Sequence, residues 1–431
     1  MKSRKLILGV VACTLLLAVA GAACGAAFDW QQFKGETVNV LALRFFYNEL
    51  IGEKLAEFEA LTGMKVVFET YPYEPMLQKH LVEFTGASER TDVYNLGPTS
   101  FGRKYYVSGW CEPLEPYVQN AQITAPDWDF LDFLPSVRNA SVIDGTRVGI
   151  PVNAVTWLLY YRKDLYVEHG LTIPQTMEDM RSNAAKLHTG DIYGWVSRGN
   201  RVQSVPIWGI FLHAFGGQFV DDQRNPGVNS PEAIQSLEFF ADLQRNYANP
   251  GAAENSHWEA VSLIQQGKAA QLIDTCTFIG LFEDPEKSTV YKDMGYARIP
   301  AGPGGRVAEL WMWTFAISPY SKNKNPAWLF IQWATSAQMQ GWIQTHKFPS
   351  ARKSVWSNPE YTKAWPDDWT KSVRKSFEIA SPICHPSVVE HGQITDVIGE
   401  AIVNVELGYD NPGDALNAAA AEMAEIMSAT E

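Results

Sequence analysis

The sequence predicts an α/β protein built of two lobes. Residues 37–70 have the pattern of an apolar strand, an amphipathic helix and a second strand, and such βαβ units imply a mainly parallel sheet. The 431 residues exceed what one hydrophobic core usually supports, so two lobes are expected. Hydrophobic side chains make up 46% of the chain, which is enough to pack both lobes well.

Similar strand and helix patterns continue along the chain. Apolar spacing predicts helices over residues 48–61, 77–84, 164–187, 231–247, 260–267, 325–334, 336–346 and 414–427. Runs of apolar, β-branched and aromatic residues predict strands over residues 37–43, 65–70, 92–96, 148–152, 156–162, 271–274 and 313–318. We expect the chain to cross first from one lobe to the other between residues 147 and 162.

The N-terminus predicts export. Three basic residues precede the apolar run 6–20 and small residues follow it, which is typical of a signal peptide over residues 1–27. Cys24 follows a degenerate lipoprotein motif, so cleavage after Ala22 or Ala27 and lipid attachment at Cys24 both stay open. Either outcome gives a periplasmic protein, secreted in soluble form or lipid-anchored.

Charge and motifs argue against several classes of function. The leader carries three basic and no acidic residues, so its removal changes the net charge from −13 to −16, a charge that repels nucleic acid. The chain contains no phosphate-binding loop, dinucleotide fingerprint, serine-hydrolase elbow or HExxH motif, and no histidine pair at the i, i+4 spacing of a helical zinc site. We therefore expect no nucleic acid, cofactor or metal as a partner, and no catalytic residue.

Three cysteines follow the leader: Cys111, Cys276 and Cys384. An odd number in an oxidising compartment permits one disulfide and one free thiol. None belongs to a CxxC pair, so the sequence indicates neither a redox motif nor a cysteine-based metal site.

Tryptophan is the most informative residue type, with fifteen in the chain. Trp157, Trp208, Trp258, Trp311 and Trp313 fall at or near predicted strand ends and loops. Sugars present C–H faces that pack on aromatic rings, and their hydroxyl groups need fixed donors and acceptors. For any single tryptophan, packing in the core is at least as good an explanation. As a group, they favour a carbohydrate site.

Two charged residues come where open α/β folds bind ligands, beyond the ends of strands. Arg44 follows the first strand and is itself followed by Phe45 and Tyr47, whereas Asp274 ends a later strand. A solvated loop for Arg44 and a capping role for Asp274 are the alternatives.

Six segments, in their order along the chain, resemble extracellular solute-binding proteins of family 1, which includes the maltose-binding protein. They are VNVLALRFFYNELIGEKLAEFEALTGMKVVFETYP, DVYNLGP, VGIPVNAVTWLLYYRKDL, AFGGQFVDD, LIQQGKAAQLID and FAISPYSKNKNPAWLFIQWATSAQMQGW. The resemblance covers nearly the whole chain after the leader. Each segment alone is a weak signal, but six in the right order are specific.

The resemblance implies the two-lobed periplasmic binding protein fold of type II, with a ligand cleft that closes by hinge motion. Lobe 1 would hold residues 28–152 and 303–332, and lobe 2 would hold residues 156–298 and 337–431. The hinges would lie near residues 153–155, 299–302 and 333–336.

The resemblance also implies ligand contacts, which come from both lobes and the crossing strands. Carried over position by position, they are Arg44, Phe45, Tyr47, Pro98, Thr99, Asn153, Trp157, Arg198, Trp208, Trp258, Asp274, Trp311 and Trp313. The chain has Thr99 and Ser100 where the maltose-binding protein has a charged pair, and Thr277 where it has an indole. These departures favour a monosaccharide, a polyol or a short oligosaccharide over a maltodextrin.

The function expected from the resemblance is that of the substrate-binding component of an ABC importer. It would act as a monomer, bind a small carbohydrate and deliver it to permease subunits in the inner membrane. A secreted glycoside hydrolase is an alternative, although only Asp274 can be nominated for its pair of carboxyl groups. A ligand sensor for a membrane receptor is another alternative. Because Arg44 could also bind a carboxylate, a sugar acid stays open beside a neutral sugar.

Overall fold

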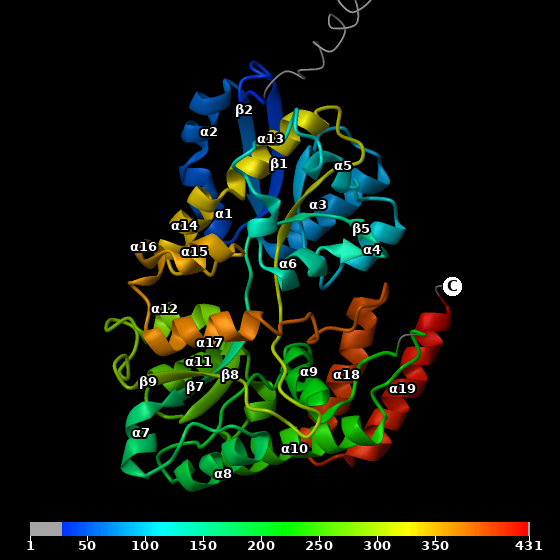
Figure 1. Ribbon diagram of the computed structural model, residues 1–431. Helices are drawn as coiled ribbons and strands as arrows, with labels where there is room; N and C mark the ends of the chain where they lie inside the picture. The colour runs from blue at the N-terminus through cyan, green and yellow to red at the C-terminus, as the bar shows by residue number, and fades with distance from the viewer. Residues whose placement is uncertain (1–27, 222, 430–431) are drawn as a thin grey trace, which may run out of the picture.

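The computed structural model describes residues 28–221 and 223–429, which form two α/β lobes, one above the other in Figure 1. The predicted signal peptide, residues 1–27, and Cys24 within it lie outside the described residues. The α/β class predicted from the sequence is confirmed, with one main sheet in each lobe and a small two-stranded sheet in the first. Among the described residues no helix is long and apolar enough to cross a membrane.

The first lobe is built around a five-stranded sheet in the order β2-β1-β3-β10-β6. Its strands are β1 (Thr37–Leu43), β2 (Lys65–Tyr71), β3 (Val93–Leu96), β6 (Ile150–Pro151) and β10 (Thr314–Ile317), beside the hairpin β4 (Val142–Ile143) and β5 (Thr146–Arg147). Its helices are α1 (Phe46–Glu53), α2 (Leu55–Thr62), α3 (Tyr73–Thr85), α4 (Gly102–Val107), α5 (Glu115–Val118), η1 (Phe130–Asp132), α6 (Pro135–Ala140), α13 (Lys324–Ala334), α14 (Ala337–Thr345), α15 (Lys353–Ser357) and α16 (Pro359–Thr362). Strands β2, β1 and β3 are parallel, and β10 is antiparallel to both of its neighbours.

The second lobe contains a three-stranded antiparallel sheet in the order β8-β7-β9. Its strands are β7 (Trp157–Arg162), β8 (Gln271–Thr275) and β9 (Met294–Arg298). Its helices are α7 (Lys163–Glu168), α8 (Met177–Leu187), α9 (Ser204–Phe215), α10 (Pro231–Tyr247), η2 (Ala252–Glu254), α11 (His257–Gln265), η3 (Cys276–Phe278), α12 (Ile279–Phe282), α17 (Asp367–Phe377), α18 (His391–Glu406) and α19 (Pro412–Ser428). Isolated parallel bridges join Tyr193 and Val196 to the segment that contains β8.

Two predicted helices are broken in the structure. The helix expected over 164–187 is α7 and α8, because Gly170 takes a left-handed φ of +61° and Pro174 follows in the intervening loop. The helix expected over 48–61 is α1 and α2, separated at Lys54, where the backbone leaves helical geometry.

The chain passes three times between the lobes (Figure 1). The first pass, 152–156, and the second, 307–313, run antiparallel and are hydrogen-bonded to each other. Val155 N–H donates to the Trp311 carbonyl at 2.8 Å, Trp311 N–H donates back at 2.9 Å, and Val152 N–H donates to the Trp313 carbonyl at 2.9 Å. The third pass joins α16 to α17.

The positions of these passes differ in part from those that the resemblance implies. Residues 153–155 lie in the first pass. Residues 299–302 come before the second, because the Gly304 N–H still donates to the Ala214 carbonyl of the second lobe at 2.8 Å. Residues 333–336 come before the third, because α14 packs on α1 of the first lobe. Motion at any of the passes stays a prediction.

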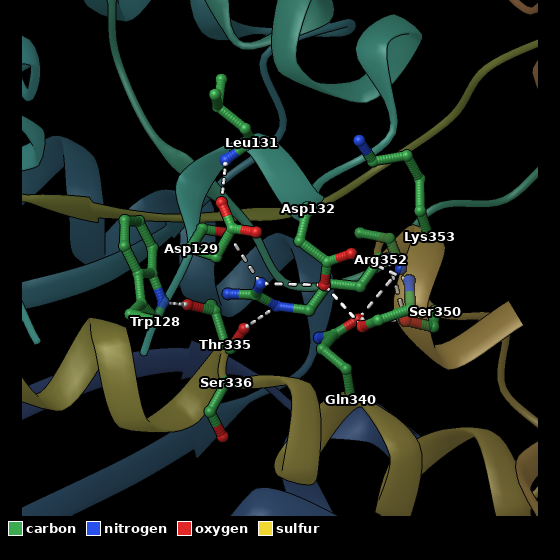
Figure 2. A network of polar contacts seen from close by, with 12 residues as sticks. Trp128, Asp129, Leu131, Asp132, Thr335, Ser336, Gln340, Ser350, Arg352 and Lys353 are labelled. Atoms are coloured by element: carbon green, nitrogen blue, oxygen red, sulfur yellow. Dashed lines mark hydrogen bonds and ion pairs between the residues drawn. The ribbon is translucent and has the colours of Figure 1, made fainter. Parts of the chain in front are cut away.

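A buried ion pair fixes α14 and α15 to the first lobe (Figure 2). Arg352 is 1% exposed, its Nη1 lies 3.2 Å from Oδ2 of Asp132, and its Nε donates to the Thr335 carbonyl at 2.7 Å. Nearby, the Gln340 side chain accepts a hydrogen bond from Ala351 N–H at 2.9 Å and donates to the Val152 carbonyl. The C-terminal helices of this lobe are thereby tied to the start of the first pass.

Cys111, Cys276 and Cys384 form no disulfide with one another or with any other described residue. The disulfide that their odd number permits is therefore not formed. Burial raises the pKa of the Cys111 and Cys276 thiols to about 12 and raises that of Cys384 well above its usual value. Thiols in such surroundings are unreactive.

Candidate ligand site between the lobes

The best-defined polar group near the passes is an ion pair between Arg198 and Asp274. Asp274 lies in β8 opposite Leu158 of β7, and Arg198 follows the segment that runs parallel to β8. Arg198 Nε donates to Oδ2 of Asp274 at 2.9 Å and Nη2 donates to Oδ1 at 2.5 Å. Asp274 is fully buried, and the Thr275 N–H also donates to its Oδ1 at 2.6 Å. The pair is therefore both buried and bidentate.

The guanidinium group is further held by an aromatic face. Its carbon lies 5.2 Å from the ring centroid of Trp157, the first residue of β7. No described residue accepts a hydrogen bond from Arg198 Nη1. The arrangement therefore leaves N–H donors for a ligand while the positive charge is balanced by Asp274.

Three aromatic rings lie on the second lobe close to this pair. His257 packs on Trp258 with centroids 4.6 Å apart and stacks on Phe278 at 5.9 Å. Trp258 is 59% exposed, which is unusual for an indole and leaves a face free. Partial burial, and then the charge of Arg198, lower the pKa of His257, so its ring is neutral at pH 7.

The passes contribute a second aromatic cluster. Trp311 and Trp313 meet edge to face at 5.6 Å, and Trp313 also contacts Phe101 at 5.8 Å and Tyr73 at 6.2 Å. Asn153 Oδ1 accepts a hydrogen bond from the backbone N–H of Trp313 at 3.1 Å. The buried Nδ2 of Asn153 and Nε1 of Trp313 have no partner among the described residues.

A cavity of about 420 Å³ lies between the lobes. Pro98, Thr99 and Arg103 line it from the first lobe, and residues 380–382 and Ser387 line it from the second. The Thr99 hydroxyl is buried and, within the described chain, unpartnered. The size is within the range of small-molecule sites. A cavity with walls from both lobes could couple ligand binding to their relative position.

The predicted site residues that follow β1, Arg44, Phe45 and Tyr47, do not all lie with the candidate residues described above. Phe45 is half-exposed and packs on Phe348 and Tyr47, with centroids 5.8 Å away in both cases. Tyr47 is fully buried in α1, and burial raises its pKa well above the usual value. Arg44 is exposed, and among the described residues its side chain donates only to the Thr70 carbonyl, at 3.5 Å. The structure does not join Arg44 to the Arg198 pair.

Trp208 lies apart from the other candidates. It is fully buried in α9, its Nε1 donates to Ser236 at 3.0 Å, and its ring packs on Phe219 at 5.8 Å. These are the contacts of a core residue of the second lobe.

Four residues near the site were not predicted from the sequence: His257, Phe278, His385 and Glu309. His257 and Phe278 lie close in the sequence to the predicted residues Trp258 and Asp274, and this nearness could have pointed to them. His385 and Glu309 carry no sequence signal. Burial, followed by the charges of His391 and Arg198, lowers the pKa of His385 to about 3, and its ring packs on that of His391 with centroids 5.4 Å apart.

Two α/β lobes, joined by three passes, with a polar cavity between them and aromatic side chains on the passes and the second lobe, define a two-lobed binding protein. The chain belongs to the bacterial extracellular solute-binding protein family, whose model matches residues 46–341. This confirms the resemblance inferred from the six segments. Members of the family are binding proteins of ABC importers, and the family implies a periplasmic or extracellular location.

Three known proteins are similar over most of their length. The erythritol/L-threitol-binding protein of Mycolicibacterium smegmatis is 28% identical over 335 residues, 72% of this chain and 69% of that protein. A solute-binding protein from Agrobacterium radiobacter K84, solved with ribitol, is 27% identical with a TM-score of 0.79, covering 91% of this chain and 99% of that one. One from Agrobacterium vitis S4, solved with D-mannitol, is 25% identical with a TM-score of 0.74, covering 92% and 99%.

Proposed function

We propose that the chain is the substrate-binding component of an ABC importer for a small neutral carbohydrate, most specifically a linear polyol. The three relatives bind or are named for erythritol or L-threitol, ribitol and D-mannitol, all of which are linear polyols. A chain of hydroxyl groups with apolar C–H faces matches a site of fixed donors and indole rings.

The observation that carries the proposal is the balanced charge of the Arg198 pair. Both oxygens of Asp274 accept hydrogen bonds from Arg198, so the carboxylate cancels the positive charge where the ligand would bind. A sugar acid would bring a second negative charge to this neutral pair, at a desolvation cost that nothing there offsets. Hydroxyl groups can use the remaining N–H donors at no such cost. A neutral ligand is therefore favoured.

The ligand contacts proposed are Trp157, Arg198, Asp274 and Trp258 from the second lobe, Trp311, Trp313 and Asn153 from the passes, and Thr99 and Pro98 from the first lobe. Arg44, Phe45 and Tyr47 stay candidates for the rim of the first lobe. A ligand that touches both lobes would favour the closed form, since it binds that form more tightly than the open one. The first and second passes are the proposed hinges, together with residues 363–366.

Binding is tested by thermal unfolding of the chain from residue 28 with erythritol, ribitol, mannitol, monosaccharides, maltose and sugar acids. A ligand at about 100 times its Kd should raise the free energy of unfolding by about 2.7 kcal/mol. We expect this with a polyol and not with a sugar acid. In Arg198→Lys the rise should shrink, and in the control Arg201→Lys it should not, because Arg201 forms exposed pairs with Asp396 and Glu400.

Two outcomes would overturn the proposal. If only a sugar acid stabilises the protein, the proposal of a neutral ligand is wrong. If no carbohydrate stabilises it, the ligand is not a carbohydrate. Overnight incubation separates binding from hydrolysis, because a hydrolase would consume an oligosaccharide and release product. Asp274 does not suit hydrolysis, since both of its oxygens are occupied by Arg198.

The proposed partners are the permease subunits, with the binding protein acting as a monomer. Size-exclusion chromatography with light scattering tests the monomer, and stimulation of transport by the purified chain in permease-containing vesicles separates the importer from a sensor. Mass spectrometry of the exported N-terminus decides between cleavage after Ala22 or Ala27 and lipid attachment at Cys24.

A further inference from the structure

A cavity on the second lobe, distinct from the one between the lobes, carries an excess of positive charge. It has a volume of about 310 Å³ and lies between residues 173–175, the C-terminal half of β9 and α17. Three cationic side chains line it, Arg298, Arg306 and Lys371, against one carboxylate, that of Asp368. The chain as a whole has a net charge of −13, so this concentration of cations runs against its composition.

The cations of this cavity are not neutralised by close carboxylates. Within residues 28–221 and 223–429, neither Arg298 nor Arg306 forms an ion pair, and the buried Nε of Arg298 has no partner. Arg306 donates instead to backbone carbonyls, including that of Gln175 at 3.1 Å. Lys371 lies 3.9 Å from Asp367, but both side chains are largely exposed, so the pair is weak.

Asp368 is occupied by backbone groups. Its Oδ2 accepts from the Tyr296 N–H at 3.2 Å and its Oδ1 from the Trp369 N–H at 3.0 Å. It reduces the positive charge of the cavity without pairing with either arginine. Arg298 and Arg306 line the same cavity, and burial, followed by the charge of Arg298, lowers the pKa of Arg306, as expected for two neighbouring cations.

We propose that this cavity is a second binding site, for a small oxyanion or a carboxylate-bearing molecule. Two neighbouring guanidinium groups cost free energy when nothing negative lies between them, and an oxyanion accepts hydrogen bonds from both. The unused Nε–H of Arg298 and the ammonium group of Lys371 add donors of the same kind. The proposal is independent of the carbohydrate site, because none of its residues is among the proposed carbohydrate contacts and none lines the cavity between the lobes.

The test is a calorimetric titration of the mature chain with sodium phosphate, sulfate and citrate, at an ionic strength kept constant with sodium chloride. Constant ionic strength matters because salt screens every exposed charge. We expect at least one of the three to bind more tightly than chloride. Its Kd should rise at least tenfold in Arg298→Gln and at least threefold in Lys371→Gln.

Lys375→Gln is the matched control, because Lys375 is an exposed lysine of the same helix that pairs with Glu378 and does not line the cavity. Its Kd for the anion should stay within twofold of the parent value. Lys371 is also exposed, so its replacement tests the site without endangering the fold. The proposal fails if none of the three anions binds better than chloride, or if binding persists unchanged in both cavity variants. Carbohydrate binding, measured in parallel, should be the same in all four proteins.

Discussion

Oε2 of Glu309 accepts a hydrogen bond from the backbone N–H of Cys384 at 2.9 Å, and it also accepts one from Ile383 at 2.9 Å. Glu309 lies in the second pass and is 1% exposed, whereas residues 383–384 continue the segment that lines the cavity between the lobes. Oε1 of Glu309 has no partner in the described residues. A single buried carboxyl group thus joins a pass to the wall of the site.

This arrangement predicts a pH-dependent stability. Burial raises the pKa of Glu309 to about 7, well above its value in the unfolded chain, so the folded state holds the proton more tightly. The free energy of unfolding that Glu309 contributes is therefore fully present below about pH 4 and is lost as the pH rises through about 7. The loss amounts to about 3 kcal/mol.

Urea titrations of the parent and of Glu309→Gln at pH 5, 6, 7 and 8 measure this effect. The parent should lose stability relative to Glu309→Gln as the pH rises across this range. Burial lowers the pKa of His80 and of His385 to about 3, which acts in the opposite direction, but both histidines are present in both proteins and their effect cancels. Parallel pH profiles for the two proteins would contradict the prediction.

Asp274→Asn should reduce both stability and ligand affinity. Removing the negative charge leaves the largely buried guanidinium of Arg198 without its partner, which costs about 3–5 kcal/mol of unfolding free energy. The freed side chain also loses its fixed orientation, so we expect a rise in Kd of at least tenfold by calorimetry. Asp396→Asn is the control, because Asp396 pairs with Arg201 in solvent and should change neither quantity appreciably.

Alanine variants of Trp208 and Trp258 should distinguish a residue that stabilises the fold from one that binds the ligand. Trp208 is fully buried and Trp258 is 59% exposed. We expect Trp208→Ala to lower the free energy of unfolding by about 3–5 kcal/mol and to leave the Kd of the folded fraction unchanged. Trp258→Ala should change stability little and raise the Kd. The opposite pattern, in denaturation and calorimetry on the same preparations, would remove Trp258 from the site.

The ion pair of Figure 2 predicts a strong effect on the stability of the first lobe. Asp132→Asn leaves the charge of Arg352 buried without a carboxylate, so the unfolding free energy should fall by about 3–5 kcal/mol. Asp127→Asn provides the comparison, because Asp127 is an exposed residue of the same loop. Equal stability of the two variants would show that the pair contributes nothing.

The three thiols should be inaccessible in the native protein. Cys276 and Cys384 are fully buried, and Cys111 is partly buried, with its Sγ 3.6 Å from the Tyr94 hydroxyl. A thiol reagent at pH 8 should react slowly with the native chain from residue 28, and all three thiols should react at once after unfolding in guanidinium. If only one thiol reacts after unfolding, the other two form a disulfide in the native protein, and the prediction is wrong.

Local pattern predicted much of the fold, but long-range pairs could not be predicted. The strand over 37–43 is correct to the residue because apolar periodicity is a local signal. The Arg198 and Asp274 positions came only from the resemblance and a strand end, and their pairing spans 76 residues. It depends on where the segment after Tyr193 lies against β8, which no local pattern determines.

Trp208 shows the converse. Its helix is apolar on every side, from Ser204 to Phe215, and such helices are buried. That signal was available in the sequence and favours the core, whereas the positional match to the family favoured the ligand site. The break at Lys54 has only a weak signal, because Gly52 stands in the last turn of α1 without a positive φ and no proline follows it.

The antiparallel hydrogen bonds between the first two passes have a kinetic consequence. A hydrogen-bonded two-stranded ribbon resists sliding more than bending or twisting, so we expect rotation of one lobe against the other to be the main motion between them. Ligand capture then divides into a bimolecular encounter with one lobe and a unimolecular rotation of the other. The observed rate of capture should grow with ligand concentration and then level off at the rate of that rotation, which the ribbon and not the ligand sets.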